Sequence, residues 1–416
     1  MADGATGPMQ AARDHAYSIP LDEIDVSNVD LFTSNTFWPY FDRLRAEDPV
    51  HYTPNSAYGP YWAVTKFEDI VAVESDPATF SSSSARGGIS IYGGHEPEER
   101  TSFISMDPPR HDAQRKVVAP MFSTHSIHRL APLIRERAAK ILDELPIGET
   151  FDFVDKVSIE LTSQMLATLF DWPFEKRRLL PRASDLILGG MNEGQDQAAR
   201  QAELMMIFGH FFELWNQRSN APPSDDLISM LAHGDATKTN DPQYYASNLV
   251  LLTVAGSDTT RHSITGGLIA LNENPDQYAR LRADPELLNS AVPEIIRYQS
   301  PVAHMRRTAT RDVMVGGKQI REGDAVIMWY VSGNRDETVI DRPYDFIIDR
   351  VRPRHHAAFG FGLHRCLGNR LAEVQLKVVW EEMLKRFEFI EIVGEPERLR
   401  SNFVKGYETL PVRIRA

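Results

Sequence analysis

Cysteine is nearly absent from this sequence, which has a single one among 416 residues. One thiol cannot form a disulfide within the chain, and it cannot supply a cysteine-rich zinc site or an iron–sulfur cluster. The sequence also lacks any apolar run near the roughly 18 residues that a membrane span requires. The first residues show no charged-then-apolar secretory pattern. We therefore expect a cytoplasmic protein without a membrane span.

Basic residues are outnumbered, with 45 lysines and arginines against 58 acidic side chains and a net charge of -13. This balance disfavours general nucleic-acid binding, which needs a basic footprint. An apolar fraction of 42% with 9% aromatic residues excludes a disordered chain. Length alone favours two or three domains, at about 150 residues each.

Repeats and low-complexity linkers are also missing, so nothing in the sequence divides the chain into separate domains. We predict a flexible tail over residues 1–25 and a single domain over residues 26–416. Apolar residues recur at helical spacing in most segments, while strand patterns are few. Helices are predicted at 125–145, 157–170, 198–217, 287–298 and 369–387, and strands at 61–66, 313–320 and 325–331. The expected fold class is mainly α with small β-sheets.

One predicted helix is unusually long. Asp241 and Pro242 are typical of a cap followed by the first helical turn, and helical chemistry continues to about Asn274. At 1.5 Å per residue this helix is about 50 Å long. Residues 249–255 are apolar on all sides, which places its middle in the centre of the protein.

The only cysteine, Cys366, follows a glycine-rich loop and precedes a predicted helix. A helix N-terminus and the flanking His364 and Arg365 favour an anionic sulfur. A lone cysteine is more often a small buried apolar residue, and a nucleophile with His364 as its base is a second alternative. The glycines and the two cations favour a metal-ligand role instead.

The run from Phe359 to Gly368 reads Phe-Gly-x-Gly-x-His-x-Cys-x-Gly. It resembles the haem-binding loop of the cytochrome P450 family. The resemblance implies that Cys366 is the thiolate ligand of the iron of haem b, with Phe359, Gly360, His364 and Gly368 around the cofactor. It also implies the cytochrome P450 fold, a single large helical domain around a long central helix.

The middle of the long helix carries Ala255, Gly256, Asp258 and Thr259. Acidic, hydroxyl and glycine residues are poor choices for a buried helix centre, which favours a functional reason. A threonine hydroxyl can bond to the carbonyl one turn earlier and bend the helix. The segment is similar to the oxygen-binding segment of the family, which implies that Asp258 and Thr259 relay protons and that Ala255 and Gly256 border the cofactor. An ordinary polar kink is the alternative.

Glu294 and Arg297 lie three residues apart on a predicted helix, so their side chains can meet. Such pairs are common on solvated surfaces. In the family, however, this pair joins a later arginine in a buried triad that braces the haem loop. The resemblance favours Arg350 as the third member, with Arg342 as the alternate.

His111 and Arg115 lie one helical turn apart and can point the same way. The resemblance assigns both to the anionic haem propionates and adds Arg307 and His364. The alternative for His111 and Arg115 is a capped surface helix.

The implied reaction is monooxygenation of a C–H bond with O2. The chain leaves no room for a reductase domain, so the electrons should come from an external iron–sulfur ferredoxin with its NAD(P)H-dependent reductase. An acidic ferredoxin could dock on the basic residues near Cys366. These residues are Arg350, Arg352, Arg354, His355, His356, Arg365 and Arg370. A monomer is expected.

The substrate is expected to be apolar, because the positions that face haem in the family are almost all apolar here. The resemblance places Ile89, Ile91, Leu186, Ile187, Leu252, Val302, Met305 and Phe403 in the substrate pocket, although such residues are more often plain core. Residues 332–337 and 401–407 resemble the bacterial branch that hydroxylates terminal carbons of alkanes and fatty acids.

A linear medium-chain alkane or fatty acid is therefore the first expectation, and a terpenoid or steroid is the second. A haem-thiolate sensor without turnover is an alternative of a different class, but a sensor has no need of a proton relay. A peroxide-driven or isomerising relative is a third, and such relatives typically lack the acid–alcohol pair.

Overall fold

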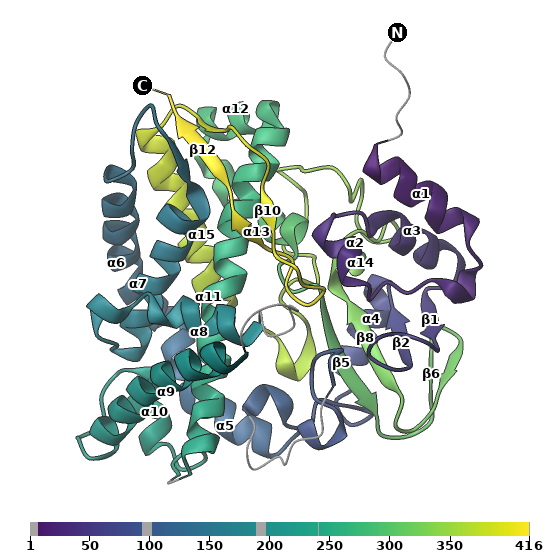
Figure 1. The fold of residues 1–416 in the computed structure, drawn as a ribbon, viewed down its shortest axis with the longest axis horizontal. Helices are drawn as coiled ribbons and strands as arrows, with labels where there is room; N and C mark the ends of the chain where they lie inside the picture. The colour runs from purple at the N-terminus through teal and green to yellow at the C-terminus, as the bar shows by residue number, and fades with distance from the viewer. Residues whose placement is uncertain (1–6, 94–101, 189–196, 240, 416) are drawn as a thin grey trace.

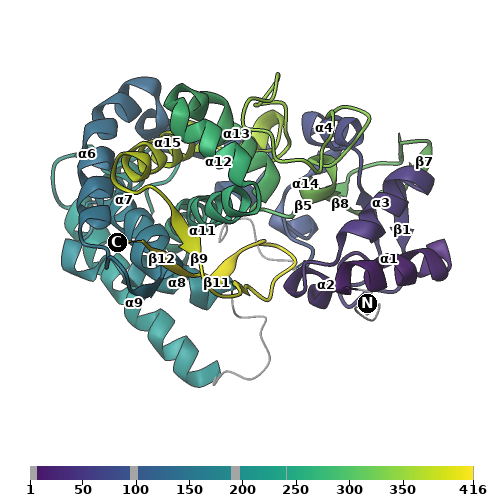
Figure 2. The same ribbon diagram turned by 90° about the horizontal axis from the view of Figure 1, so that it is seen from above.

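The computed structural model describes residues 7–93, 102–188, 197–239 and 241–415. A helical part and a smaller part built on a β-sheet lie side by side in one domain (Figures 1 and 2). The division that length alone suggested, into two or three domains, is therefore wrong. The predicted class, mainly α with small sheets, is confirmed.

The largest sheet has five strands in the order β1-β2-β8-β5-β3. β2 and β8 are parallel, and the other neighbours are antiparallel. The register pairs His304 of β5 with Trp329 of β8. Trp329 is fully buried, and its ring packs against Phe32 and Phe41 from the N-terminal helices. The strands are β1 Val50–Thr53, β2 Tyr61–Val64, β3 Phe80–Ser81, β5 His304–Ala309 and β8 Ala325–Trp329.

The helical part is organised around α11, Pro242–Glu273, which is a single unbroken helix of 32 residues. Leu249, Ile264 and Leu268 on this helix are fully buried. Among the helices that it contacts are α7 Glu160–Phe170, α8 Leu179–Leu188, α13 Leu288–Gln299 and α15 Asn369–Arg386. The prediction of a long central helix is confirmed.

The remaining helices surround the five-stranded sheet and α11 (Figure 1). They are α1 Pro8–Ser18, α2 Val29–Thr33, α3 Trp38–Glu47, α4 Phe67–Ser75, α5 Arg110–Val118, α6 Thr124–Asp143, α9 Gln197–Ser219, α10 Leu227–His233, α12 Pro275–Ala283 and α14 Tyr330–Gly333. Three small sheets complete the fold: β4 Thr150–Asp152 with β12 Pro411–Ile414 and β9 Ile390–Ile392, β10 Glu397–Arg398 with β11 Tyr407–Thr409, and the hairpin β6 Val313–Val315 with β7 Lys318–Ile320.

The predicted flexible tail over residues 1–25 is wrong for its central part. Residues Pro8–Ser18 form α1, which packs on α3 through the buried Ala12 and Ala16. Arg43 of α3 donates hydrogen bonds to the carbonyls of Ala16 and Ile19, both at 2.7 Å. Two small residues one turn apart were too weak a pattern to predict this contact.

The helix predicted at 157–170 starts earlier than expected. A π-helical turn, Val154–Ile159, runs directly into α7. Among the described residues, no helix is both long enough and apolar enough to cross a bilayer.

Candidate active site

The loop that carries Cys366 is held by backbone geometry and by one buried acid. Gly360 and Gly362 have φ of +65° and +61°, and a Cβ on Gly362 would collide with the carbonyl oxygen of Glu74 in α4. The N–H of Cys366 donates to the carbonyl of Phe359 at 2.8 Å. Non-glycine residues rarely adopt this backbone region, so the glycines set the path of the loop.

Glu74 organises the base of this loop. Its buried carboxylate accepts hydrogen bonds from the Phe361 N–H and the Tyr330 hydroxyl, and it pairs with Arg307 at 3.0 Å. Sequence reasoning missed Glu74, because its partners lie more than 200 residues away and no local motif marks it. Arg307, which the sequence assigned to a haem propionate, therefore pairs with the Glu74 carboxylate, and its charge also acts on His364.

The Cys366 side chain is exposed on one side of the loop. Loss of solvent around the sulfur raises the pKa of the thiol. A hydrogen bond from the Gly368 backbone and the charges of Arg115 and Arg365 lower it, but the net shift is upward. The arginines beside Cys366 act on the thiol in the direction expected from the sequence, but burial opposes them. A coordinated metal cation deprotonates a thiol, so a bound cation is needed to make it a thiolate.

Two histidines beside Cys366 present unpartnered donors. The rings of His111 in α5 and His364 lie 4.3 Å apart between centroids, and the buried Nε2 atom of each has no hydrogen-bond partner among the described residues. Burial, with the charges of Arg307, His111 and Arg115, lowers the pKa of His364 to about 2. Buried unpartnered nitrogens among arginines are well suited to an anion. The residues therefore fit the carboxylates of a haem.

The middle of α11 holds a buried acid. Asp258 is 1% exposed, accepts a hydrogen bond from Ser184 of α8 at 2.9 Å, and lies 3.1 Å from Arg261. Arg261 also pairs with Asp185 of α8 at 2.6 Å. Burial raises the pKa of Asp258 to about 6 against the lowering effect of Arg261. A carboxyl with a pKa near neutrality can both hold and release a proton.

Thr259 follows Asp258, and its hydroxyl donates to the carbonyl of Ala255 at 3.0 Å. Ala255 is exposed, although Leu249 and Ile264 on either side of it along α11 are fully buried. The helix therefore leaves Ala255 uncovered at its centre, between buried residues. The helix remains unbroken there, so the hydrogen bond does not interrupt it.

Gly256 has a packing reason of its own. A Cβ at this position would lie 2.7 Å from Cδ2 of Leu166 in α7. Only glycine lets the two helices approach this closely without a shift of Leu166. The predicted place of Gly256 beside the cofactor stays a prediction.

Glu294 and Arg297 of α13 form a fully buried pair. Nε and Nη2 of Arg297 lie 2.7 Å from the two carboxylate oxygens, and Arg350 Nε lies 2.9 Å from Oε2 of Glu294. Burial alone would raise the pKa of Glu294, but the hydrogen bonds and charges of Arg297 and Arg350 outweigh it, and the pKa is lowered. The alternate, Arg342, instead pairs with the exposed Asp345.

The predicted substrate-pocket residues divide into two sets. Ile91 and Leu186 are 3% and 2% exposed and belong to packed apolar clusters. Leu252 is also buried, while partly exposed positions are Ile89, Ile187, Val302, Met305 and Phe403. Packing therefore accounts for Ile91, Leu186 and Leu252, and the place of the other five in a substrate pocket stays a prediction.

Comparison with known proteins gives the class. The family described as Cytochrome P450 matches residues 214–408. Linalool 8-monooxygenase from Pseudomonas putida is 36% identical over 404 residues, which cover 93% of this chain and 98% of that protein. The fold and these likenesses define a haem-dependent monooxygenase.

Solved structures of cytochromes P450 have the same fold as this chain. Cytochrome P450-153 from Novosphingobium aromaticivorans is 45% identical with a TM-score of 0.87, covering 94% of this chain and 99% of that one. A Mycobacterium marinum cytochrome P450 in complex with pseudoionone is 33% identical with a TM-score of 0.87, covering 95% and 99%. The chain belongs to the cytochrome P450 family, whose cofactor is haem b with a cysteine thiolate ligand.

Replacing Arg350 should be far more damaging than replacing Arg342. Arg350→Ala leaves Glu294 with one cation in a buried setting, and breaking a buried pair costs about 3–5 kcal/mol. Arg342→Ala removes only an exposed pair and should leave stability nearly unchanged. Urea unfolding of both variants measures the difference. Equal stability of the two would contradict the placement of Arg350 in the triad.

Proposed function

We propose that Cys366, the only cysteine of the chain, would be the thiolate ligand of the haem and that His111, Arg115, His364 and Arg307 would hold its propionates. The unpartnered Nε2 atoms of His111 and His364 support this assignment. Haem supplies the chemistry of dioxygen activation when bound. The protein then supplies the ligand, the proton path and the substrate pocket.

The observation that carries the proposed activity is the buried carboxyl of Asp258 on α11, directly before Thr259, whose hydroxyl donates to the carbonyl of Ala255. Ser184 and Arg261 hold the carboxyl, and its pKa of about 6 suits repeated loss and gain of a proton. Thr259 passes the proton from this carboxyl into the site. A haem protein that only senses a ligand needs no such pair.

We infer that the substrate is a linear medium-chain alkane or fatty acid, hydroxylated at its terminal carbon. The resemblance of residues 332–337 and 401–407 to that branch supports this choice, as do the apolar Val302, Met305 and Phe403. A terpenoid is the second candidate. It is favoured by the relative named linalool 8-monooxygenase and by the Mycobacterium marinum relative that binds pseudoionone.

A two-stage experiment tests this proposal. The haem-loaded protein, reduced under carbon monoxide, should give the Soret band of a thiolate-ligated haem, and Cys366→Ser should lose it. With ferredoxin, reductase and NADH, a panel of alkanes, fatty acids, terpenes and steroids should give ω-hydroxylated products from the linear compounds. Products from terpenes alone would select the second candidate. The thiolate band without any product would favour a sensor.

Thr259→Ala should uncouple electron use from oxygenation. Removing the hydroxyl interrupts proton delivery, and positioned proton transfer contributes about 10²–10⁴-fold to a rate. Product formed per NADH consumed should therefore fall severalfold while NADH consumption continues. Thr259→Ser, which keeps a hydroxyl, is the matched control and should retain coupling. Unchanged coupling in Thr259→Ala would contradict the relay.

We also propose that an acidic ferredoxin docks beside the cysteine loop. Of the seven predicted basic residues, Arg350 belongs to the triad and His356 is buried with its pKa lowered to about 3, so neither adds surface charge. Arg352, Arg354, Arg365 and Arg370 are exposed.

Next to them a groove of about 240 Å³ runs between α6, α13 and α15. Arg354, Arg370 and Lys377 line it with His128, and its single carboxylate, that of Glu373, pairs with Arg354 at 2.7 Å. Its floor is apolar and includes Val292 and Val374. A positive rim around an apolar floor suits a small acidic protein.

Reversing a charge at this surface should weaken the binding of ferredoxin. Arg370→Glu or Arg352→Glu should raise the KM for ferredoxin severalfold and reduce its salt dependence, while kcat at saturating ferredoxin changes little. Arg413→Glu, an exposed change on β12, is the control. Steady-state kinetics at two ionic strengths measure the effect. An unchanged KM in both variants would exclude this surface.

A further inference from the structure

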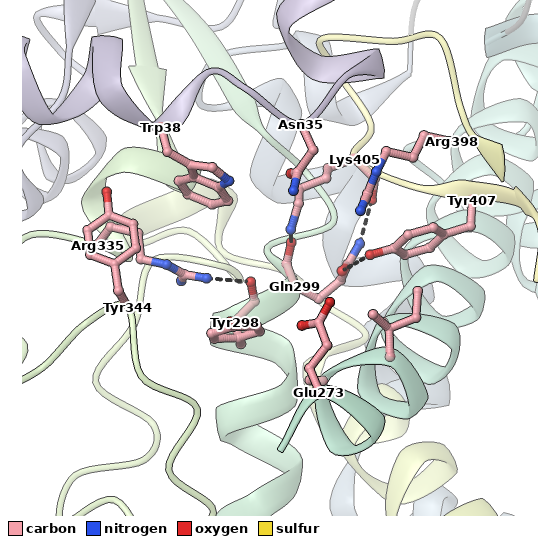
Figure 3. Close-up of a pocket in the computed structure, with 13 residues that line it drawn as sticks. Asn35, Trp38, Glu273, Tyr298, Gln299, Arg335, Tyr344, Arg398, Lys405 and Tyr407 are labelled. Atoms are coloured by element: carbon pink, nitrogen blue, oxygen red, sulfur yellow. Dashed lines mark hydrogen bonds between the residues drawn. The ribbon is translucent and has the colours of Figure 1, made fainter. Parts of the chain in front are cut away.

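A second cleft lies away from the cysteine loop, where the two parts of the fold meet (Figure 3). Its volume is about 120 Å³. The walls come from Trp38 at the start of α3, Glu273 at the end of α11, Tyr298 and Gln299 at the end of α13, and Lys405 before β11. The mechanism of oxygenation uses none of these residues.

The charges that line the cleft are unbalanced. Arg335, Arg398 and Lys405 face a single carboxylate, that of Glu273. Within the part of the chain that the structure describes, none of the three cations has a carboxylate oxygen within 4 Å. Glu273 reaches Arg398 and Lys405 only through longer-range charge.

Arg335 is the most deeply placed of the three, at 2% exposure. Its guanidinium carbon lies 4.5 Å from the ring centroid of Tyr298 and 4.9 Å from that of Trp38. Nη2 donates to the carbonyl of Tyr298 at 2.9 Å, while the buried Nε has no partner. Burial lowers the pKa of Arg335 to about 9, so it stays charged at neutral pH. Cation–π contacts offset part of the cost of burying this charge, while Glu294, whose charge also acts on Arg335, is already paired with Arg297 and Arg350.

Lys405 is held in place and is only partly satisfied. Its N–H donates to the carbonyl of Pro301, and its own carbonyl accepts from the Gln299 side chain, both at 2.8 Å. The ammonium donates to the carbonyl of Gln299 at 2.9 Å and lies 5.5 Å from the centroid of Trp38 (Figure 3). An ammonium carries three donors, so two remain for a ligand. Burial and the charges of Arg335 and Arg398 lower its pKa well below the ordinary value.

We propose that this cleft binds a small oxyanion, a carboxylate or phosphate group, between Arg335, Arg398 and Lys405. An anion would supply the missing countercharge and accept hydrogen bonds from the free Lys405 and Arg335 donors. The cavity admits a group of this size. Because its walls come from α3, α11, α13 and the segment before β11, bound anion would join the N-terminal and C-terminal parts of the chain.

The test uses the full-length, haem-loaded protein and does not depend on turnover. Inorganic phosphate and succinate are titrated against chloride at constant ionic strength, with thermal unfolding and isothermal calorimetry as readouts. A ligand that binds only the folded state raises its Tm in a saturable way. Phosphate or succinate, but not chloride, should do so.

Lys405→Gln and Arg398→Gln should weaken binding about tenfold, as expected for loss of a charge-assisted hydrogen bond. Arg413→Gln, exposed on β12 and outside the cleft, should bind like wild type. A variant of the buried Arg335 can fail to fold, so the test uses Lys405→Gln and Arg398→Gln instead. A response to phosphate alone identifies a phosphate site, and a response to succinate alone a carboxylate site. Equal responses to chloride, or undiminished binding by both variants, would overturn the proposal.

Discussion

The buried ion pair of Glu294 and Arg297 is the constraint on which the cysteine loop depends. Both side chains are fully removed from water, so each donor and acceptor must find a partner within the protein. Arg297 also donates hydrogen bonds to the carbonyls of Asn334 and Pro343, each at 2.8 Å. The side chain of Asn334 in turn accepts the N–H of Ala357, at the start of the cysteine loop. A helix in the core thereby determines where the loop begins.

The other end of the loop is held from the opposite direction. Glu74 of α4 binds Phe361, and α15 starts three residues after Cys366. The thiol is therefore fixed between two buried carboxylates, neither of which touches it. On α11, Asp258 is likewise held through Ser184 and Arg261, so the position of α8 and the state of this carboxyl are linked. Each of these buried carboxylates has a hydrogen-bond donor and a cation beside it, which lowers the cost of keeping it in a core.

Local patterns in the sequence were enough for several helices, among them the long α11, and for the β6–β7 hairpin and the motif around Cys366. All of these rest on periodicity, turn residues or short spacing. The sequence did not reveal Glu74, because the partners that give this carboxylate its role are distant in sequence and meet it only in the folded chain. The upward shift of the Cys366 pKa also escaped, since flanking cations are visible in a sequence and burial is not. Arg350 and Arg342 could not be separated by spacing, because a loop decides which guanidinium reaches Glu294. The anion cleft draws on five distant segments and leaves no local pattern at all.

The small sheet β4-β12-β9 has a consequence for how the protein is made. β12, Pro411–Ile414, lies between β4, Thr150–Asp152, and β9, Ile390–Ile392, and its middle residue Val412 is fully buried. β4 leaves the ribosome long before its neighbour has been translated, with most of the helical part still to come. Until then its edge stays open, and contacts so remote in sequence form slowly. The edge of β4 is thus open to wrong pairing, and to binding by chaperones, until β12 has been translated.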